Sequence, residues 1–124
     1  MHDVKTIREP NGNLSFMELP LYASRIFYVY GVKSGDVRGH HAHKECNQFL
    51  ICMNGTVNVT CDDGKNRQVY TLKSSTKGLY VPAMIWSEQY YYSKETMLVG
   101  LASHPFDEAD YIRSYKKFKS CASA

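Results

Sequence analysis

Three histidines occupy four positions of the stretch RGHHAHKECNQFLICMNG, residues 38–55. Alternate residues of a β-strand face the same side, so His41 and His43 point together if this stretch is a strand, whereas His40 points the other way. An imidazole titrates near neutral pH and serves either as a metal ligand or as a general acid or base. The spacing therefore predicts that His41 and His43 share a cavity.

The spacing around this pair resembles the first cupin motif, G-x5-H-x-H-x3-4-E-x6-G, which would begin at Gly35 and end at Gly55. The acidic position of that motif holds Gln48, a poor metal ligand, although Glu45 lies nearby. The second motif would place a histidine where this chain has Ser87. A catalytic divalent ion usually takes three protein ligands, so the sequence favours proton transfer over a metal site. Histidines with a purely structural role are the remaining alternative.

Short runs with a strand pattern, separated by turn signals, extend from residue 14 to residue 102 and are typical of a sandwich or barrel. The candidate strands begin at Arg25, Gln48, Thr56, Arg67, Gly78, Glu88 and Met97. In the tail, apolar residues recur with helical spacing from Tyr111 to Phe118, and Asp107 is available as an N-cap. We expect one all-β domain, residues 1–124, with a short C-terminal helix on the outside of the sheet.

The composition excludes several classes of protein. The net charge is +3, and the basic cluster KKFK at residues 116–119 is too small for a nucleic-acid surface. A membrane span needs about 20 consecutive apolar residues, and neither such a run nor a signal peptide is present. The four cysteines show no C-x-x-C spacing, so we interpret them as reduced thiols. We expect a cytoplasmic protein with no nucleic-acid or membrane partner.

Several segments together resemble a known family. RGHHAHKECNQFLICMNGTV, KGLYVPAMIW and ASHPFDEADYIRSYKKF are similar, in order and spacing, to sugar-nucleotide 3,4-ketoisomerases of the cupin superfamily. The resemblance implies a cupin-type double-stranded β-helix, or jelly roll. It also implies a metal-independent enzyme without a cofactor, and a homodimer that exchanges N-terminal strands. Its substrate would be dTDP-4-keto-6-deoxyglucose, on the route to 3-amino-3,6-dideoxy sugars of surface polysaccharides.

Two segments depart from the family pattern. Asn11, in EPNGNL, stands where arginine is usual, and the stretch after the tryptophan reads SEQYYYS. Both changes bear on substrate contacts. The nucleotide and the C4 stereochemistry of the product, galacto or gluco, are therefore left open.

Moving a ketone from C4 to C3 requires removal of the C3 proton and an enediol intermediate. We interpret His43 as the base and His41 as a proton donor or as the group that polarises the C4 oxygen, and the sequence does not decide the order. Tyr28 and Tyr30 share one face of a strand, so we expect both hydroxyls to reach the cavity and stabilise the enediolate. Packing against neighbouring strands is the alternative for both.

Other residues are candidates for binding the nucleotide. A planar guanidinium holds phosphate oxygens in pairs, so Arg38 is our candidate for the diphosphate and Arg25 the second. Trp86 is the candidate wall for the thymine ring, and Glu88 and Gln48 are candidate polar groups in the cavity. In DYIRSY, Arg113 and the tyrosines are expected to hold the helix rather than to contact substrate.

Three rival functions remain open from sequence. A cupin-type 3,5-epimerase uses a histidine base on similar ketosugars, and the position of the ketone in the product distinguishes it. A non-catalytic cupin that binds nucleotide sugars would show no turnover. A metal-dependent dioxygenase would contain a metal.

Overall fold

The structure is a computed structural model that describes residues 1–73 and 77–123. Strands dominate these residues, which confirms the all-β prediction. The strands are β1 (His2–Asp3), β2 (Lys5–Glu9), β3 (Gly12–Phe16), β4 (Arg25–Val29), β5 (Val37–His43), β6 (Gln48–Asn54), β7 (Thr56–Asp62), β8 (Arg67–Lys73), β9 (Lys77–Val81), β10 (Trp86–Tyr91), β11 (Met97–Ala102) and β12 (Tyr111–Ile112). The α-helix α1 spans Tyr115–Ser123.

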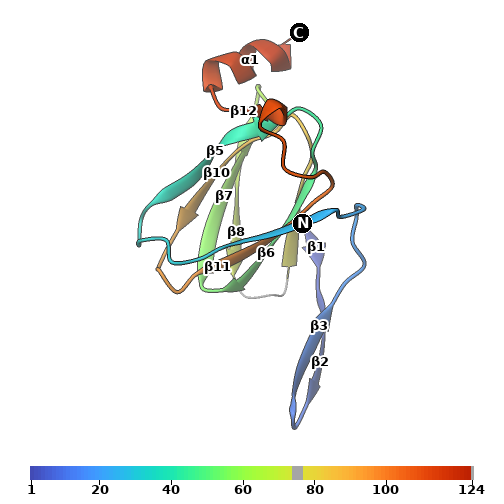
Figure 1. Ribbon diagram of the computed structural model, residues 1–124. Coiled ribbons are helices and arrows are strands. Elements are labelled where there is room, and N and C mark those ends of the chain that lie inside the picture. The colour runs from blue at the N-terminus through green and yellow to red at the C-terminus, as the bar shows by residue number, and fades with distance from the viewer. Residues whose placement is uncertain (74–76, 124) are drawn as a thin grey trace.

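Two antiparallel five-stranded sheets form the body of the molecule (Figure 1). The first sheet has the order β1-β9-β6-β11-β4, and the second has the order β12-β5-β10-β7-β8. Alternate residues of a strand point inward, and the core forms between the sheets where these inward residues are apolar. The buried members of this core are Val32, Leu50, Cys52, Val57, Val59, Leu72, Leu79, Val81, Tyr91 and Leu98.

One core position lacks a side chain so that a neighbour can cover it. Gly100 of β11 pairs with Phe27 of β4, and an added Cβ on Gly100 would collide with the Phe27 ring. The ring therefore lies flat across the first sheet on its inner side. This arrangement makes Phe27 part of a smooth apolar wall.

The C-terminal tail differs from the sequence prediction. Asp107 caps a short 3-10 helix, Glu108–Asp110, by accepting a hydrogen bond from the Ala109 N–H. The chain then pairs with β5 as β12, and α1 begins only at Tyr115, with the Ser114 hydroxyl accepting from the Lys117 N–H. A strand was missed here because a two-residue strand has no periodicity of its own.

The predicted place of the helix is confirmed. Phe118 of α1 is fully buried and packs with Trp86, Ala42 and Ile112 in a second apolar cluster on the outer side of β10 and β5. In the described part of the chain, no helix is long and apolar enough to cross a membrane.

The hairpin of β2 and β3 projects away from the two sheets (Figure 1). Ile7, Leu14 and Phe16 on one of its faces are exposed. β1, just before it, adds to the edge of the first sheet by pairing with β9.

Candidate active site

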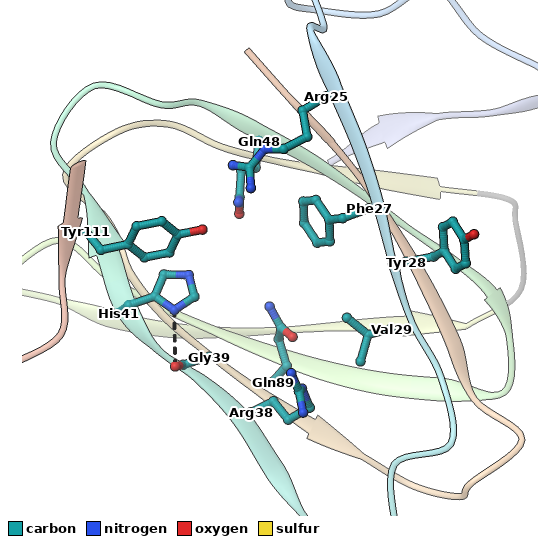
Figure 2. Close-up of a pocket in the computed structure, with 10 residues that line it drawn as sticks. All are labelled: Arg25, Phe27, Tyr28, Val29, Arg38, Gly39, His41, Gln48, Gln89 and Tyr111. Carbon is teal, nitrogen blue, oxygen red and sulfur yellow. Dashed lines mark hydrogen bonds between the residues drawn. The ribbon is translucent and has the colours of Figure 1, made fainter. Parts of the chain in front are cut away.

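A cavity of about 310 Å³ opens between the two sheets. Figure 2 shows His41 and Tyr111 on one side facing Phe27 and Val29 on the other. Its lining residues are Arg25, Phe27, Tyr28, Val29, Arg38, Gly39, His41, Gln48, Gln89 and Tyr111. Cationic and amide side chains therefore converge on a space with one apolar wall, as ligand sites for polar molecules usually do.

A β-bulge in β5 brings Arg38 to the same cavity as His41. Glu88 pairs with Gly39, and His40 has no partner of its own, so the register shifts at this point. Gly39 has φ of 96° and His40 has φ of 57°, which is the left-handed backbone of a bulge. Strict alternation would send Arg38 and His41 to opposite faces, because they are three residues apart. The extra residue returns both to the inner face.

His43 is buried and bonded to a carboxylate. Its Nδ1 lies 2.9 Å from Oδ2 of Asp110, whose oxygens also accept from the backbone N–H groups of Glu45 at 2.8 Å and Cys46 at 3.3 Å. Burial opposes ionisation of Asp110, but these hydrogen bonds outweigh it and lower the pKa of the carboxyl. Asp110 is thus an anion that accepts a hydrogen bond from the N–H at Nδ1 of His43.

The other ring nitrogen of His43 is hydrogen-bonded to a side-chain amide. Nε2 lies 3.2 Å from the Gln48 side-chain nitrogen, a donor, so Nε2 carries the lone pair. Burial lowers the pKa of His43, although the Asp110 carboxylate works in the opposite direction. The ring packs against Tyr111 at 4.3 Å and His41 at 5.1 Å between centroids, and both of these line the cavity. His43 is therefore a neutral imidazole with its lone pair on Nε2. It is not itself one of the lining residues, and it lies directly behind three that are, His41, Gln48 and Tyr111.

His41 has the same tautomer as His43, with its proton on Nδ1. Its Nδ1 lies 3.1 Å from the Gly39 carbonyl and donates to it, which leaves Nε2 as an acceptor (dashed line in Figure 2). Burial, and then the neighbouring His43, lower the pKa of His41 to about 4. Near neutral pH this ring is uncharged and accepts a hydrogen bond. The sequence allowed His41 to act as a donor, and this geometry favours the opposite role.

Arg25 places a fixed positive charge at the cavity. Its Nε donates to the His104 carbonyl at 3.2 Å, which anchors the side chain. Burial opposes its charge, but interactions with Tyr111 and Cys46 hold the pKa of Arg25 above its usual value. The phenol of Tyr111 therefore lies beside a guanidinium, an arrangement that favours negative charge on a nearby oxygen.

One cluster has donor atoms within reach of a cation. Ligand atoms of His43, Cys46 and Asp110 lie within 4.8 Å of one another. The Asp110 oxygens are already bonded to three N–H groups, and the Arg25 guanidinium lies 4.0 Å from Cys46 Sγ. A nearby guanidinium and committed carboxylate oxygens suit a hydrogen-bond network better than a metal ion. The expectation of no metal stays a prediction.

Comparison with known proteins identifies the family. The family model FdtA, described as "WxcM-like, C-terminal", matches residues 1–123. A TDP-4-oxo-6-deoxy-α-D-glucose-3,4-oxoisomerase from Aneurinibacillus thermoaerophilus is 40% identical over 119 residues, which cover 93% of this chain and 86% of the relative.

Two solved structures extend the match to three dimensions. WlaRA, a TDP-fucose-3,4-ketoisomerase from Campylobacter jejuni, is 35% identical with a TM-score of 0.90, covering 98% of this chain and 93% of its own. QdtA, a sugar 3,4-ketoisomerase from Thermoanaerobacterium thermosaccharolyticum in complex with TDP, is 31% identical with a TM-score of 0.93, covering 98% and 92%. The chain belongs to the FdtA family of sugar 3,4-ketoisomerases. The predicted resemblance and the cupin-type fold are thereby confirmed.

Two predicted site residues of this FdtA-family chain do not reach the cavity with their hydroxyls. Tyr28 and Tyr30 are 59% and 64% exposed, and their rings stack on each other. Tyr28 borders the cavity, but its ring points away from the other lining side chains (Figure 2). Phe27 and Val29 occupy the inward positions of β4. The sequence predicted that the face of Tyr28, which is the opposite face, points inward. Placing both hydroxyls in this cavity was wrong.

Trp86 and Glu88 also lie outside the cavity of the FdtA-family chain. Trp86 packs beneath α1, against Phe118 and Tyr115, and donates from Nε1 to Glu88 at 2.9 Å. Both occupy outward positions of β10, whereas Gln89, between Glu88 and the next outward residue, faces inward. The expected roles as thymine wall and cavity partner are corrected to a structural role at the helix.

Three residues of the site were not predicted from the sequence. Asp110 and Tyr111 were assigned to the helical tail, and β12 brings them to His43 instead. Gln89 carried no signal beyond its alternation with Trp86 and Glu88. By contrast, Arg25, Arg38 and Gln48 line the cavity, as expected for substrate-binding groups.

Proposed function

We infer that this chain moves the keto group of dTDP-4-keto-6-deoxyglucose from C4 to C3. The observation that carries the proposal is His43 held between a carboxylate at Nδ1 and an amide donor at Nε2, beside a cavity of suitable chemistry. A neutral imidazole with a fixed tautomer is a base, and an anion at its other nitrogen stabilises the imidazolium that proton abstraction creates. The named relatives support the substrate class.

The proton path follows from these tautomers. His43 Nε2 takes the proton from C3 after the substrate displaces the Gln48 amide from that nitrogen. The resulting enediolate carries its charge on the C4 oxygen, where the Tyr111 hydroxyl and the Arg25 guanidinium supply donors. The His43 imidazolium then returns a proton to C4.

The hydroxyl proton also has to move for the reaction to balance. The 3-hydroxyl loses its proton when the C3 ketone forms, and the C4 oxygen gains one. His41 Nε2 accepts the proton of the 3-hydroxyl, and the Tyr111 hydroxyl gives its proton to the C4 oxygen. The proton on His41 then passes to Tyr111, so both residues return to their starting states. Their rings are 5.0 Å apart between centroids, a spacing that suits adjacent oxygens of one sugar ring.

The remaining lining residues suit a nucleotide sugar. Arg38 supplies a cation for the diphosphate, and Phe27 and Val29 provide the apolar wall against which a 6-deoxy sugar packs. The reaction would supply 3-keto sugars for amination toward 3-amino-3,6-dideoxy sugars of surface polysaccharides. We place this biosynthesis in the cytoplasm.

Proton NMR in heavy water tests the reaction. Wild type, His43→Asn and His41→Asn are incubated with dTDP-4-keto-6-deoxyglucose and a chelator. We expect a 3-keto sugar with deuterium at C4, loss of turnover in His43→Asn, and no effect of the chelator. Deuterium at C3 and C5 without ketone migration would instead identify a 3,5-epimerase. Binding without any exchange would identify a non-catalytic sugar-binding protein.

We also propose that two copies associate and exchange N-terminal strands. The outer face of the first sheet is apolar: Tyr28, Val99 and Ile51 lie in register across three strands. The hairpin of β2 and β3, here called the arm, forms an apolar groove with this sheet, and Phe16 and Met53 border the groove. A second copy of the chain offers the same complementary arm and face, and burying both would remove apolar surface from water.

Light scattering after gel filtration tests the association. Leu14→Glu places a charge on the apolar face of the hairpin, where Leu14 pairs with Ile7. Asn13→Glu places the same charge on the opposite face and is the matched control. We expect a dimer for wild type and Asn13→Glu and a monomer for Leu14→Glu. A wild-type monomer at micromolar concentration would overturn the proposal.

A further inference from the structure

Gln89 is a buried amide on the wall of the cavity that the mechanism above does not use. Its side chain is 6% exposed and projects inward from β10. Its cross-strand partner in the second sheet is Arg38, so the two side chains lie next to each other (Figure 2). An uncharged donor and a cation therefore share one end of the cavity.

Tyr91 fixes the orientation of this amide. Its hydroxyl donates to Gln89 Oε1 at 2.9 Å, and its ring is a fully buried member of the core. A phenylalanine would fill the same space without the cost of burying a hydroxyl, so the phenol oxygen is retained at an energetic disadvantage unless it has a polar partner. That partner is the Gln89 carbonyl oxygen.

The other end of the amide is left for a ligand. With Oε1 held by Tyr91, the Nε2 group points into the cavity (Figure 2). Within residues 1–73 and 77–123, no protein acceptor bonds this nitrogen, and no buried polar side-chain atom lacks a partner, so Nε2 faces the open space of the cavity. Two N–H donors in fixed directions are thus presented to whatever occupies it.

The register shows which part of a nucleotide sugar would lie there. His41 pairs with Ser87, two residues before Gln89 on β10, and two residues of a strand span about 7 Å. That length is comparable with a pyranose ring together with its anomeric oxygen. With C3 and C4 beside the histidines, the phosphoryl group attached to the sugar lies at the level of Gln89 and Arg38.

We propose that Gln89, oriented by Tyr91, binds the sugar-linked phosphoryl group of the nucleotide diphosphate together with Arg38. This inference rests on the proposed function, because it requires the sugar to bind with its reacting carbons at His41 and His43. Arg38 supplies the charge, and Gln89 supplies a directed hydrogen bond without adding a second flexible cation. Gln89 contacts the ligand, and Tyr91 is a positioning residue.

Calorimetric titration with TDP and with TMP tests the proposal, because TMP lacks the phosphoryl group in question. The variants are Gln89→Leu, Gln89→Glu and Tyr91→Phe. Tyr92→Phe is the matched control, since its hydroxyl accepts from Asn58 on the exposed side of the strand pair. Thermal unfolding shows whether each variant folds. If Tyr91→Phe does not fold, the two Gln89 variants still test the proposal.

We expect the Kd for TDP to rise about tenfold or more in Gln89→Glu and by less in Gln89→Leu and Tyr91→Phe, with the Kd for TMP within about threefold of wild type. In turnover, KM should follow the Kd for TDP, with kcat nearly unchanged. Unaltered TDP affinity in both Gln89 variants, or equal losses of affinity for TDP and TMP, would overturn this inference and leave the proposed function standing. If wild type binds neither TDP nor the sugar nucleotide, the proposed function fails with it.

Discussion

Nδ1 of His43 lies 2.9 Å from the carboxylate of Asp110, a residue 67 positions further along the chain. This contact places the imidazole proton on Nδ1 and leaves Nε2 as the base. It also supplies the anion that stabilises the imidazolium formed during proton abstraction. The pairing of β12 with β5 creates the contact, since Tyr111 of β12 lies opposite His43.

Asp110→Asn should abolish most of the activity. The single oxygen of the introduced amide would accept from the Glu45 and Cys46 N–H groups, which turns its NH2 toward His43 Nδ1 and forces the proton onto Nε2. The base would lose its lone pair, and we expect kcat to fall by about 10²- to 10⁴-fold. Steady-state kinetics measures this. Asp107→Asn, which keeps an N-cap outside the site, is the control and should stay within about threefold of wild type.

Gln48→Glu should shift the pH profile. A carboxylate within hydrogen-bond distance of His43 Nε2 stabilises the imidazolium, so the pKa of His43 should rise by about one to three units. The acidic limb of kcat/KM should move to higher pH by that amount, because the base has to be neutral. Gln48→Leu adds no charge and should leave the limb where wild type has it. A limb that is the same in both variants would contradict the assignment of His43 as the base.

Stability should depend on pH through the two histidines. Their folded-state pKa values lie below the ordinary value of 6.5, His41 at about 4, so the unfolded chain binds more protons between these values. The free energy of unfolding should therefore fall as pH decreases below about 6.5, and it should not vary for this reason above it. Urea unfolding from pH 7.5 to 5 measures the slope. His41→Asn should make the slope shallower, and an unchanged slope would argue against the buried neutral ring.

Gly39→Ala should disrupt the bulge. A Cβ at this position would lie 2.9 Å from the Ser87 carbonyl, and φ is 96°. We expect a destabilisation of about 1–3 kcal/mol and a higher KM, because Arg38 depends on the bulge for its inward position. Gly31→Ala is the control for backbone strain alone, since its φ is 71° and no atom lies within 4 Å of an added Cβ. Equal losses in both variants would show that contact with β10 is unimportant.

The sequence predicted the parts of the site that depend on local alternation. His41 and His43 lie on one strand two residues apart, and the structure brings their rings within 5.1 Å. The strands beginning at Arg25, Gln48, Thr56, Arg67 and Met97 are found where the pattern indicated. These features were predictable because a strand with one polar and one apolar face can bury the apolar face in only one orientation.

Other assignments failed where the choice of face was ambiguous. Tyr28 and Phe27 are both large and apolar enough to be buried, so alternation alone did not tell which of them faces inward. Trp86 was assigned to the cavity mouth because the packing position of α1 was unknown. Arg38 does line the cavity, although a regular strand would have turned it outward. Its role at the diphosphate stays a prediction.

The sequence by itself determined the all-β class, the histidine pair and, through three segments of family pattern, the type of reaction. Only the tertiary structure decided the tautomer of His43, the inward turn of Arg38 and the contact between Tyr91 and Gln89. The alternation of polar and apolar residues depends only on neighbours in the chain. It therefore indicates which residues form a strand, but not which other strand pairs with it. The partner is set by burial of the whole core, which brings Asp110 and Gln48 to opposite sides of one imidazole.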